Sequence, residues 1–356
     1  MPTWYLSMWM MGYSQVWKVF GQDTLLNHLA AAVKKDTFHH AYLFTGPERT
    51  GKKLMALDLA KALNCEFKDA PCGECDSCKR IDSLMHADIW LVDLAQHGDE
   101  PENKKTIKNE EIEELQHAAN LPPFEGRTRV FIIDGAEAFT SSAANRLLKI
   151  LEEPPPRVVF VLLAESGENV LPTIASRCQQ LEFRHVAYND LEEYLLQRGK
   201  VDEAEAKMLA HLSGGRPGWA IAAMEDENFL ADFLETRNRI LELYSASREE
   251  RFDYAENAAT RFAVDRKPVI AELKCWQSLT RDILFVQYGL EEKVVNCDIL
   301  KQLKTLAGLY DPIEIRNILV AVIHARHQLY RNVNPRLVLE ALVLALECPG
   351  EVPVKI

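Results

Sequence analysis

The chain has 356 residues, enough for about two or three domains with sizeable cores. Its apolar content of 47% and charged content of 26% are those of an ordinary soluble protein. The net charge of −12 argues against nucleic acid as the main, independently bound partner, because such binding is mostly neutralisation of phosphates. Minor contact with DNA inside a larger assembly is compatible with this charge.

Residues 1–15 form an apolar stretch that predicts a disordered or misassigned N-terminal extension, and either Met1 or Met11 can be the true start. The first positive charge after this stretch is Lys18, whereas a signal peptide begins with a charged region and ends at a cleavage site. The stretch is also too short to span a bilayer. We therefore expect a cytoplasmic protein without a membrane association.

An apolar run, Ala41–Phe44, leads into a glycine-flanked loop and then into a helical pattern at 54–63. The loop fits the pattern G-x-x-x-x-G-K, with Gly46, Gly51 and Lys52 at its fixed positions. Between a strand and a helix, such a loop cradles phosphates with its N–H groups and its lysine. Lys53, however, occupies the place of the Ser or Thr that holds Mg²⁺. We predict a genuine P-loop that is either working or vestigial.

Four cysteines follow the P-loop helix within a short segment, and they are Cys65, Cys72, Cys75 and Cys78. Thiolates at C-x₂-C spacing can surround a tetrahedral ion, so the segment 65–78 predicts a structural zinc module. The alternatives are reduced thiols and disulfides. A cytosolic compartment disfavours disulfides, and unliganded thiols leave the spacing unexplained.

Further apolar runs predict strands at 89–94, 130–134, 158–164 and 181–183. Helical patterns and a polar loop at 97–109 lie between them, and one helix runs from Thr140 to Leu151 before a proline triplet. Alternating strands and helices predict an α/β domain with a parallel sheet covered on both faces. Asp134 ends one strand, where a Walker B acid organises Mg²⁺, but Gly135 follows it instead of a glutamate.

Strand patterns end near Val186, and the remainder reads as helices. Short helices surround the glycine-rich segment 213–218. Longer ones are expected at 229–245, 248–262, 268–288, 297–309, 312–330 and 335–346. Pro268, Pro312 and Pro335 stand at expected helix starts, where proline is well tolerated.

Several motifs together resemble the bacterial DNA polymerase III clamp loader, within the AAA+ superfamily. They are Phe20–Gln22, His40–Gly46, the four cysteines, Asn145–Pro155 (NRLLKILEEPP) and Leu171–Cys178 (LPTIASRC). The last two are highly specific. Motifs cover residues 16 to about 225, and the all-helical character covers the rest.

The resemblance implies three parts, namely an AAA+ P-loop domain at 16–185, a small helical lid at 186–227 and an all-α collar for oligomerisation at 228–356. It also implies partners. These are gamma/tau and delta subunits in a hetero-pentameric ring, with the sliding clamp and primer-template DNA in the assembly. The chain would then belong to a DNA-directed DNA polymerase complex, a nucleotidyltransferase.

Within this family the motor subunits, gamma or tau, should carry Thr after the P-loop lysine, Glu after the Walker B Asp, and an arginine in the lid. Here those positions hold Lys53, Gly135 and, by our alignment, Gly218, with Arg216 close by. A cation at Lys53 repels Mg²⁺ rather than binding it. The three departures resemble delta-prime subunits, ring members of motor shape whose own sites have decayed. We therefore expect no Mg²⁺ at this site, and ATP or ADP binding stays open.

Arg177 lies between Ser176 and Cys178, and from the sequence alone it reads as a surface cation. The family motif implies instead an arginine finger supplied in trans to a neighbouring ATPase site. For Glu152 and Glu153 the resemblance implies a role in fold and interface rather than in chemistry.

Three hypotheses follow. The first is a non-hydrolysing stator that completes a neighbour's active site. The second is a gamma/tau-type motor that itself binds and hydrolyses ATP, with an unusual metal-ligand position. The third is a zinc-dependent nucleic-acid binder, which the acidic balance and the position of the cysteines inside an α/β domain disfavour. Lys53 and Gly135 favour the stator over the motor.

Overall fold

The computed structural model describes residues 17–67, 69–93, 109–139, 141–331 and 333–346. The predicted extension at 1–15 and most of the polar loop at 97–109 lie outside these ranges. The chain divides into two compact units. The first runs to Asp190 and includes Arg216–Trp219; the second holds Leu191–Gly215 and the chain from Ala220 onward. Within the described ranges, no helix is both long and apolar enough to cross a bilayer.

The first unit is built on a five-stranded parallel sheet in the order β2-β3-β4-β1-β5. Its strands are β1 (Ala41–Thr45), β2 (Ile89–Asp93), β3 (Arg129–Asp134), β4 (Val158–Ala164) and β5 (Gln179–Glu182). Every residue of β1 and β4 is buried, as a sheet covered on both faces requires. The predicted α/β class with a parallel sheet is confirmed, and the last strand starts two residues earlier than expected.

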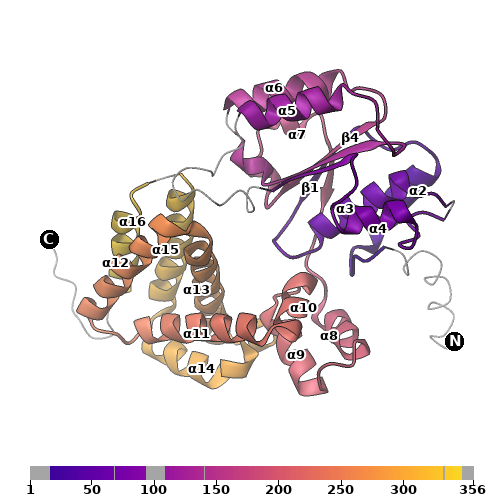
Figure 1. The fold of residues 1–356 in the computed structure, drawn as a ribbon. Coiled ribbons are helices and arrows are strands. Elements are labelled where there is room, and N and C mark those ends of the chain that lie inside the picture. Colours follow the sequence, from indigo (N-terminus) through magenta and orange to yellow (C-terminus); the bar gives the residue numbers. More distant parts are fainter. Residues whose placement is uncertain (1–16, 68, 94–108, 140, 332, 347–356) are drawn as a thin grey trace. The chain divides into compact units, whose positions relative to one another are not determined.

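Helices cover both faces of this sheet, and the alternation of side chains along the strands decides which face each residue joins (Figure 1). Tyr42 and Phe44 pack with α2 (Asp23–Lys34), α3 (Lys52–Asn64) and α4 (Asp76–Asp82). Ala41 and Leu43 pack on the other face. There the cover consists of α5 (Asn109–Ala119), α6 (Ser141–Glu152) and α7 (Pro172–Ala175). The period of two along β1 therefore separates two cores.

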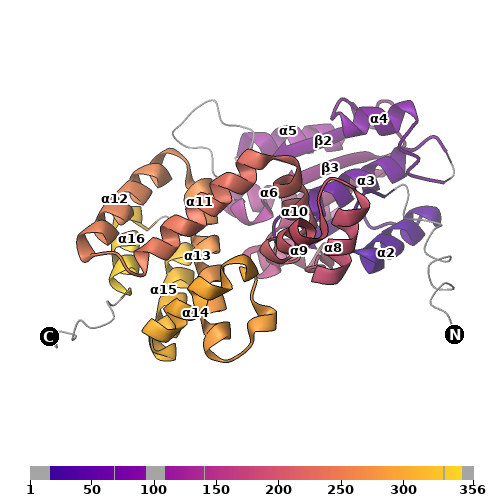
Figure 2. The same ribbon diagram turned by 90° about the horizontal axis from the view of Figure 1, so that it is seen from below.

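Beyond β5, every regular element that the structure describes is a helix, and nearly all of these residues belong to the second unit. After α8 (Tyr188–Gln197), α9 (Glu203–Leu212) and α10 (Pro217–Glu225), six further helices follow (Figure 2). They are α11 (Glu227–Leu243), α12 (Arg248–Val264), α13 (Arg266–Gln287), α14 (Leu300–Leu309), α15 (Pro312–Tyr330) and α16 (Pro335–Leu344). The predicted all-helical remainder is confirmed.

The six helices from α11 to α16 share one hydrophobic core, which includes the fully buried Trp276. Prolines and capping residues set several helix starts. Pro312 opens α15 behind a capping box of Asp311 and Glu314, and Pro335 opens α16 behind the cap Asn334. The division of this region into a lid and a collar stays a prediction.

Candidate functional site

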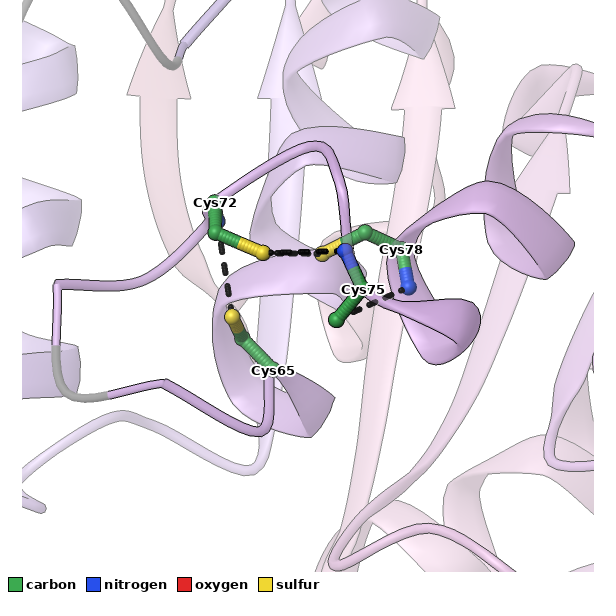
Figure 3. A group of neighbouring side chains, drawn as sticks. All are labelled: Cys65, Cys72, Cys75 and Cys78. Atoms are coloured by element: carbon green, nitrogen blue, oxygen red, sulfur yellow. Dashed lines mark hydrogen bonds between the residues drawn. The ribbon is translucent and has the colours of Figure 1, made fainter.

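The four cysteines come together at the end of α3 and the start of α4 (Figure 3). Their sulfur atoms all lie within 4.8 Å of one another. The Sγ atoms of Cys72 and Cys78 are 3.9 Å apart. A tetrahedral zinc ion with Zn–S bonds of about 2.3 Å places its sulfurs about 3.8 Å apart. The cluster therefore fits a structural zinc site.

The thiols of the cluster differ in how readily they ionise. Burial raises the pKa of the Cys78 thiol. Burial acts in the same direction on Cys72, but N–H donation from Cys75 and Glu74 outweighs it and lowers the pKa of Cys72 to about 7. Four thiols packed this closely repel one another once ionised, and a divalent ion removes that cost.

The cysteine module is fastened to the sheet through neighbouring polar residues. The Oδ1 atom of Asn64 accepts the backbone N–H groups of Arg127 and Thr128 at 2.8 and 2.9 Å. The guanidinium of Arg127 donates to the carbonyl of Cys65 at 2.6 Å. Because β3 begins at Arg129, these bonds tie the first cysteine to the strand that ends at Asp134.

The predicted P-loop forms the turn between β1 and α3. Gly46 has a φ of +135°, and a Cβ atom there would lie 2.3 Å from the carbonyl oxygen of Phe183. Only glycine fits this close approach. Gly51 precedes the first turn of α3 with a φ of +99°. The loop therefore has the strand–loop–helix setting that phosphate binding requires.

The side chain of Lys52 donates hydrogen bonds to carbonyl groups of its own loop. Its side chain is buried, and its Nζ donates to the carbonyl of Gly46 and, at 2.8 Å, to that of Pro47. Burial lowers the pKa of Lys52, while Glu165 and Asp134 oppose that shift. The ammonium group is thus bound by loop carbonyls.

Two acids near Lys52 were not singled out in the sequence. Glu165 follows β4 and Glu137 lies in the short helix after β3, and both carboxylates act electrostatically on Lys52. For Glu165, the sequence did offer a signal, because an acid stands directly after a buried strand and that strand neighbours β1. Asp134 ends β3 as predicted, and Gly135 follows it in a left-handed conformation. This edge of the sheet carries several negative charges around one lysine.

Lys53 and Gly218 occupy two further positions where the motor subunits should carry other residues. Lys53 is half-buried in the first turn of α3, where the motor subunits should carry threonine. Gly218 belongs to the segment that packs with the first unit, and its N–H donates to the carbonyl of Arg49 in the P-loop at 2.9 Å. A Cβ atom at Gly218 would lie 2.9 Å from that oxygen, so a larger side chain has no room there.

Arg177 lies after the short helix α7, just before β5. Its Nη2 donates to Oε1 of Glu152 at 2.5 Å, and its Nη1 donates to the carbonyl of Thr173 at 3.0 Å. The side chain is 34% exposed. The following residue, Cys178, is buried in the core beneath α6, and burial raises the pKa of its thiol to about 12.

Strand register separates Arg177 from the P-loop. Gln179 pairs with Tyr42, so Arg177 lies beyond the amino end of β1, whereas the P-loop follows its carboxyl end. The intervening strand length is about 13 Å at roughly 3.3 Å per residue. The structure therefore brings Gly46, Gly51, Lys52, Lys53 and Asp134 to one edge of the sheet and Arg177 to the other.

Two family models match the chain. One, described as DNA polymerase III, delta subunit, matches residues 21–187, and the other, described as DNA polymerase III, delta subunit, C terminal, matches residues 232–348. Among solved structures, a gamma subunit-related protein of DNA polymerase III from Thermotoga maritima is 18% identical with a TM-score of 0.42, covering 92% of this chain and 98% of that one.

Curated relatives extend this comparison. The chain is 29% identical to DNA polymerase III subunit tau of Bacillus subtilis over 248 residues, which are 65% of this chain and 42% of that relative. It is 32% identical to DNA polymerase III subunit delta' of Bacillus subtilis over 330 residues. That match covers 92% of this chain and 96% of the relative. The chain therefore belongs to the family of DNA polymerase III delta-prime subunits.

Proposed function

We propose that this chain is the stator of a bacterial clamp loader. It joins gamma/tau motor subunits and a delta subunit in a hetero-oligomeric ring, and it supplies Arg177 to a neighbouring ATPase site. The ring loads the sliding clamp onto primer-template DNA in the cytoplasm, as part of the DNA polymerase III holoenzyme. The observation that carries this proposal is the similarity to a delta' subunit over 92% of the chain.

The position of Arg177 supports a role in trans. The residue lies at the sheet edge away from its own P-loop, so its guanidinium cannot reach a nucleotide held there. Its side chain is partly exposed, and a guanidinium can span two phosphate oxygens with a planar pair of donors. On a neighbour's nucleotide it would stabilise charge on the transferring phosphoryl group, where such arginines contribute about 10³-fold or more to the rate.

Features of the chain's own nucleotide site support the absence of hydrolysis. The ammonium of Lys52 is bound by loop carbonyls, and Lys53 replaces the hydroxyl that ligates Mg²⁺. Gly135 offers no carboxylate to polarise an attacking water. Glu165 adds a negative charge beside the place for phosphate oxygens. Weak nucleotide binding is compatible with these features, whereas Mg²⁺-dependent turnover is not.

The cysteine cluster would hold one structural zinc ion through Cys65, Cys72, Cys75 and Cys78. The ion would supply a cross-link between the end of α3 and the start of α4 and would take no part in hydrolysis. The 13 residues of α3 separate the cluster from the P-loop by about 20 Å of helix, so the ion would lie far from the nucleotide.

ATP turnover by the purified full chain tests this proposal, first alone and then with its motor and delta subunits. We expect no hydrolysis above background by the chain alone. In the assembled ring, Lys52→Ala in this chain should leave clamp loading unchanged. Steady hydrolysis by the unmodified chain, abolished by Lys52→Ala, would identify a gamma/tau-type motor instead.

A further inference from the structure

The guanidinium of Arg177 is already held by its own chain. The Nη2 atom donates to Glu152 at 2.5 Å, and Nη1 donates to the carbonyl of Thr173 at 3.0 Å and to the hydroxyl of Ser176 at 3.4 Å. Glu152 comes from α6 and the other two partners come from the α7 region. Two separate segments therefore fix the direction of one side chain.

The end of α6 that carries Glu152 is itself fixed by contacts with the sheet. Glu152 is the last residue of α6, and the preceding Leu151 is buried against the sheet. The carbonyl of Leu151 accepts a hydrogen bond from Nε2 of His40 at 3.1 Å. A carbonyl can only accept, so Nε2 carries the proton. Because His40 directly precedes β1, the helix end that carries Glu152 is bonded to the amino end of β1.

These contacts leave part of the guanidinium available. Arginine has five N–H donors in a planar fork, and Glu152, Thr173 and Ser176 engage Nη1 and one hydrogen of Nη2. Among the residues that the structure describes, none accepts from Nε or from the second Nη2 hydrogen. Two N–H donors, that of Nε and one of Nη2, thus stay free for phosphate oxygens while the side chain is held.

We infer that Glu152 is a positioning residue for Arg177, a role that rests on the proposed function of Arg177 as a finger in trans. Glu152 restricts the rotamers of a long, flexible side chain before the neighbouring nucleotide arrives, so less freedom is lost when the transition state forms. It touches neither nucleotide nor reacting atoms. Its effect therefore passes through Arg177 alone.

The exposure of the two side chains determines how much the loss of their ion pair should change the rate. The two side chains are 34% and 52% exposed, so solvent screens their attraction. Loss of an exposed ion pair corresponds to about a two- to fivefold change in a rate that depends on it. Both side chains are partly exposed, so removing one of them leaves no buried, unpaired charge, and the fold should tolerate the loss.

The test uses the full chain in a loader reconstituted with its motor and delta subunits. Clamp-loading rates are measured against ATP concentration for Glu152→Ala, Arg177→Ala and the double variant. We expect Glu152→Ala to lower the maximal rate about two- to fivefold with an unchanged KM for ATP, because the contact acts in the transition state. Arg177→Ala should be slower, and adding Glu152→Ala to it should change nothing further.

Glu114→Ala is the matched control, since Glu114 is an exposed acid on α5 outside the motifs of the ring, and it should load at the unmodified rate. Glu152→Gln keeps a hydrogen-bond acceptor without the charge, and its rate should fall between the unmodified chain and Glu152→Ala. If Arg177→Ala slows loading but Glu152→Ala does not, or accelerates it, the positioning role is wrong and the finger stands. An additional loss in the double variant also overturns the positioning role. An unmodified rate for Arg177→Ala overturns the proposed function itself.

Discussion

Lys61 lies at the centre of a buried ion network that links the P-loop helix to the cysteine module. Its side chain is 0% exposed, and its Nζ lies 2.6 Å from Asp58 and 2.9 Å from Asp82. Asp58 is equally buried and also accepts the backbone N–H of Lys18. Burial alone would lower the pKa of Lys61, but the two carboxylates outweigh it and raise that pKa.

Lys61→Met keeps much of the volume and removes the charge. Asp58 then stays buried without its cation, a change that costs about 3–5 kcal/mol in buried pairs. Asp82 adds less, because its side chain is 32% exposed and water replaces the lost partner. We expect amides of α3 to exchange with deuterium at least about 100-fold faster at neutral pH, which corresponds to about 3 kcal/mol.

The loss should depend on pH. Burial acts to raise the pKa of Asp82, but Lys18 and Lys61 outweigh it and lower that pKa, so the pair stabilises the fold above the ordinary aspartate pKa. This stabilisation disappears as pH falls through the lowered pKa in the folded state. Burial raises the pKa of Asp58 even beside Lys61, so Asp58 also takes up a proton as pH falls and then no longer needs a cation. The difference between Lys61→Met and the unmodified chain should therefore shrink in acid.

Hydrogen exchange followed by mass spectrometry measures this effect locally, and Lys35→Met is the matched control because Lys35 is exposed. Asp58→Leu combined with Lys61→Met should recover much of the loss, since no buried charge is then left unpaired. Exchange in α3 of Lys61→Met within about threefold of the unmodified chain would show that the charge of Lys61 contributes little to the stability of this helix.

Two further predictions concern the cysteine module and the second unit. Protein purified without chelator should contain one equivalent of zinc, and metal analysis that finds less than half an equivalent would speak against the zinc site. Cys75→Ser should loosen residues 65–78 more than the sheet, because structural zinc contributes on the order of 10 kcal/mol to the folding of small modules. A fragment from Glu227 onward should co-purify with the C-terminal regions of motor subunits, since α15 buries Ile315, Ile318 and Val322 but leaves Ile313 65% exposed. A monodisperse fragment that does not bind these regions would indicate a self-contained helical bundle.

Much of the fold could be predicted from local patterns. Buried parallel strands are continuous apolar runs, so Val158–Ala164 was located to the residue. The close spacing of four cysteines between Cys65 and Cys78 likewise predicted the cluster. In such cases the residues that determine the structure lie next to one another in the chain.

Contacts between distant residues could not be read in this way. Nothing in the periodicity around Lys61 distinguishes it from a solvated lysine, because its partner Asp82 is on another helix. Glu165 reads as the start of a loop until β4 is placed beside β1. The bond between Glu152 and Arg177 joins two motifs whose separate roles the sequence does suggest. Burial and pairing across the fold decide these cases.

If this chain acts on a neighbour through Arg177, the clamp-loading rate of a ring containing Arg177→Ala must reveal it. We expect normal folding and assembly, with hydrolysis at the one neighbouring site slowed about 10³-fold and loading sharply reduced. Arg177→Lys should restore little, because an ammonium lacks the planar fork. A ring with Arg177→Ala that assembles normally and loads clamps at the unmodified rate would show that Arg177 is only a surface cation.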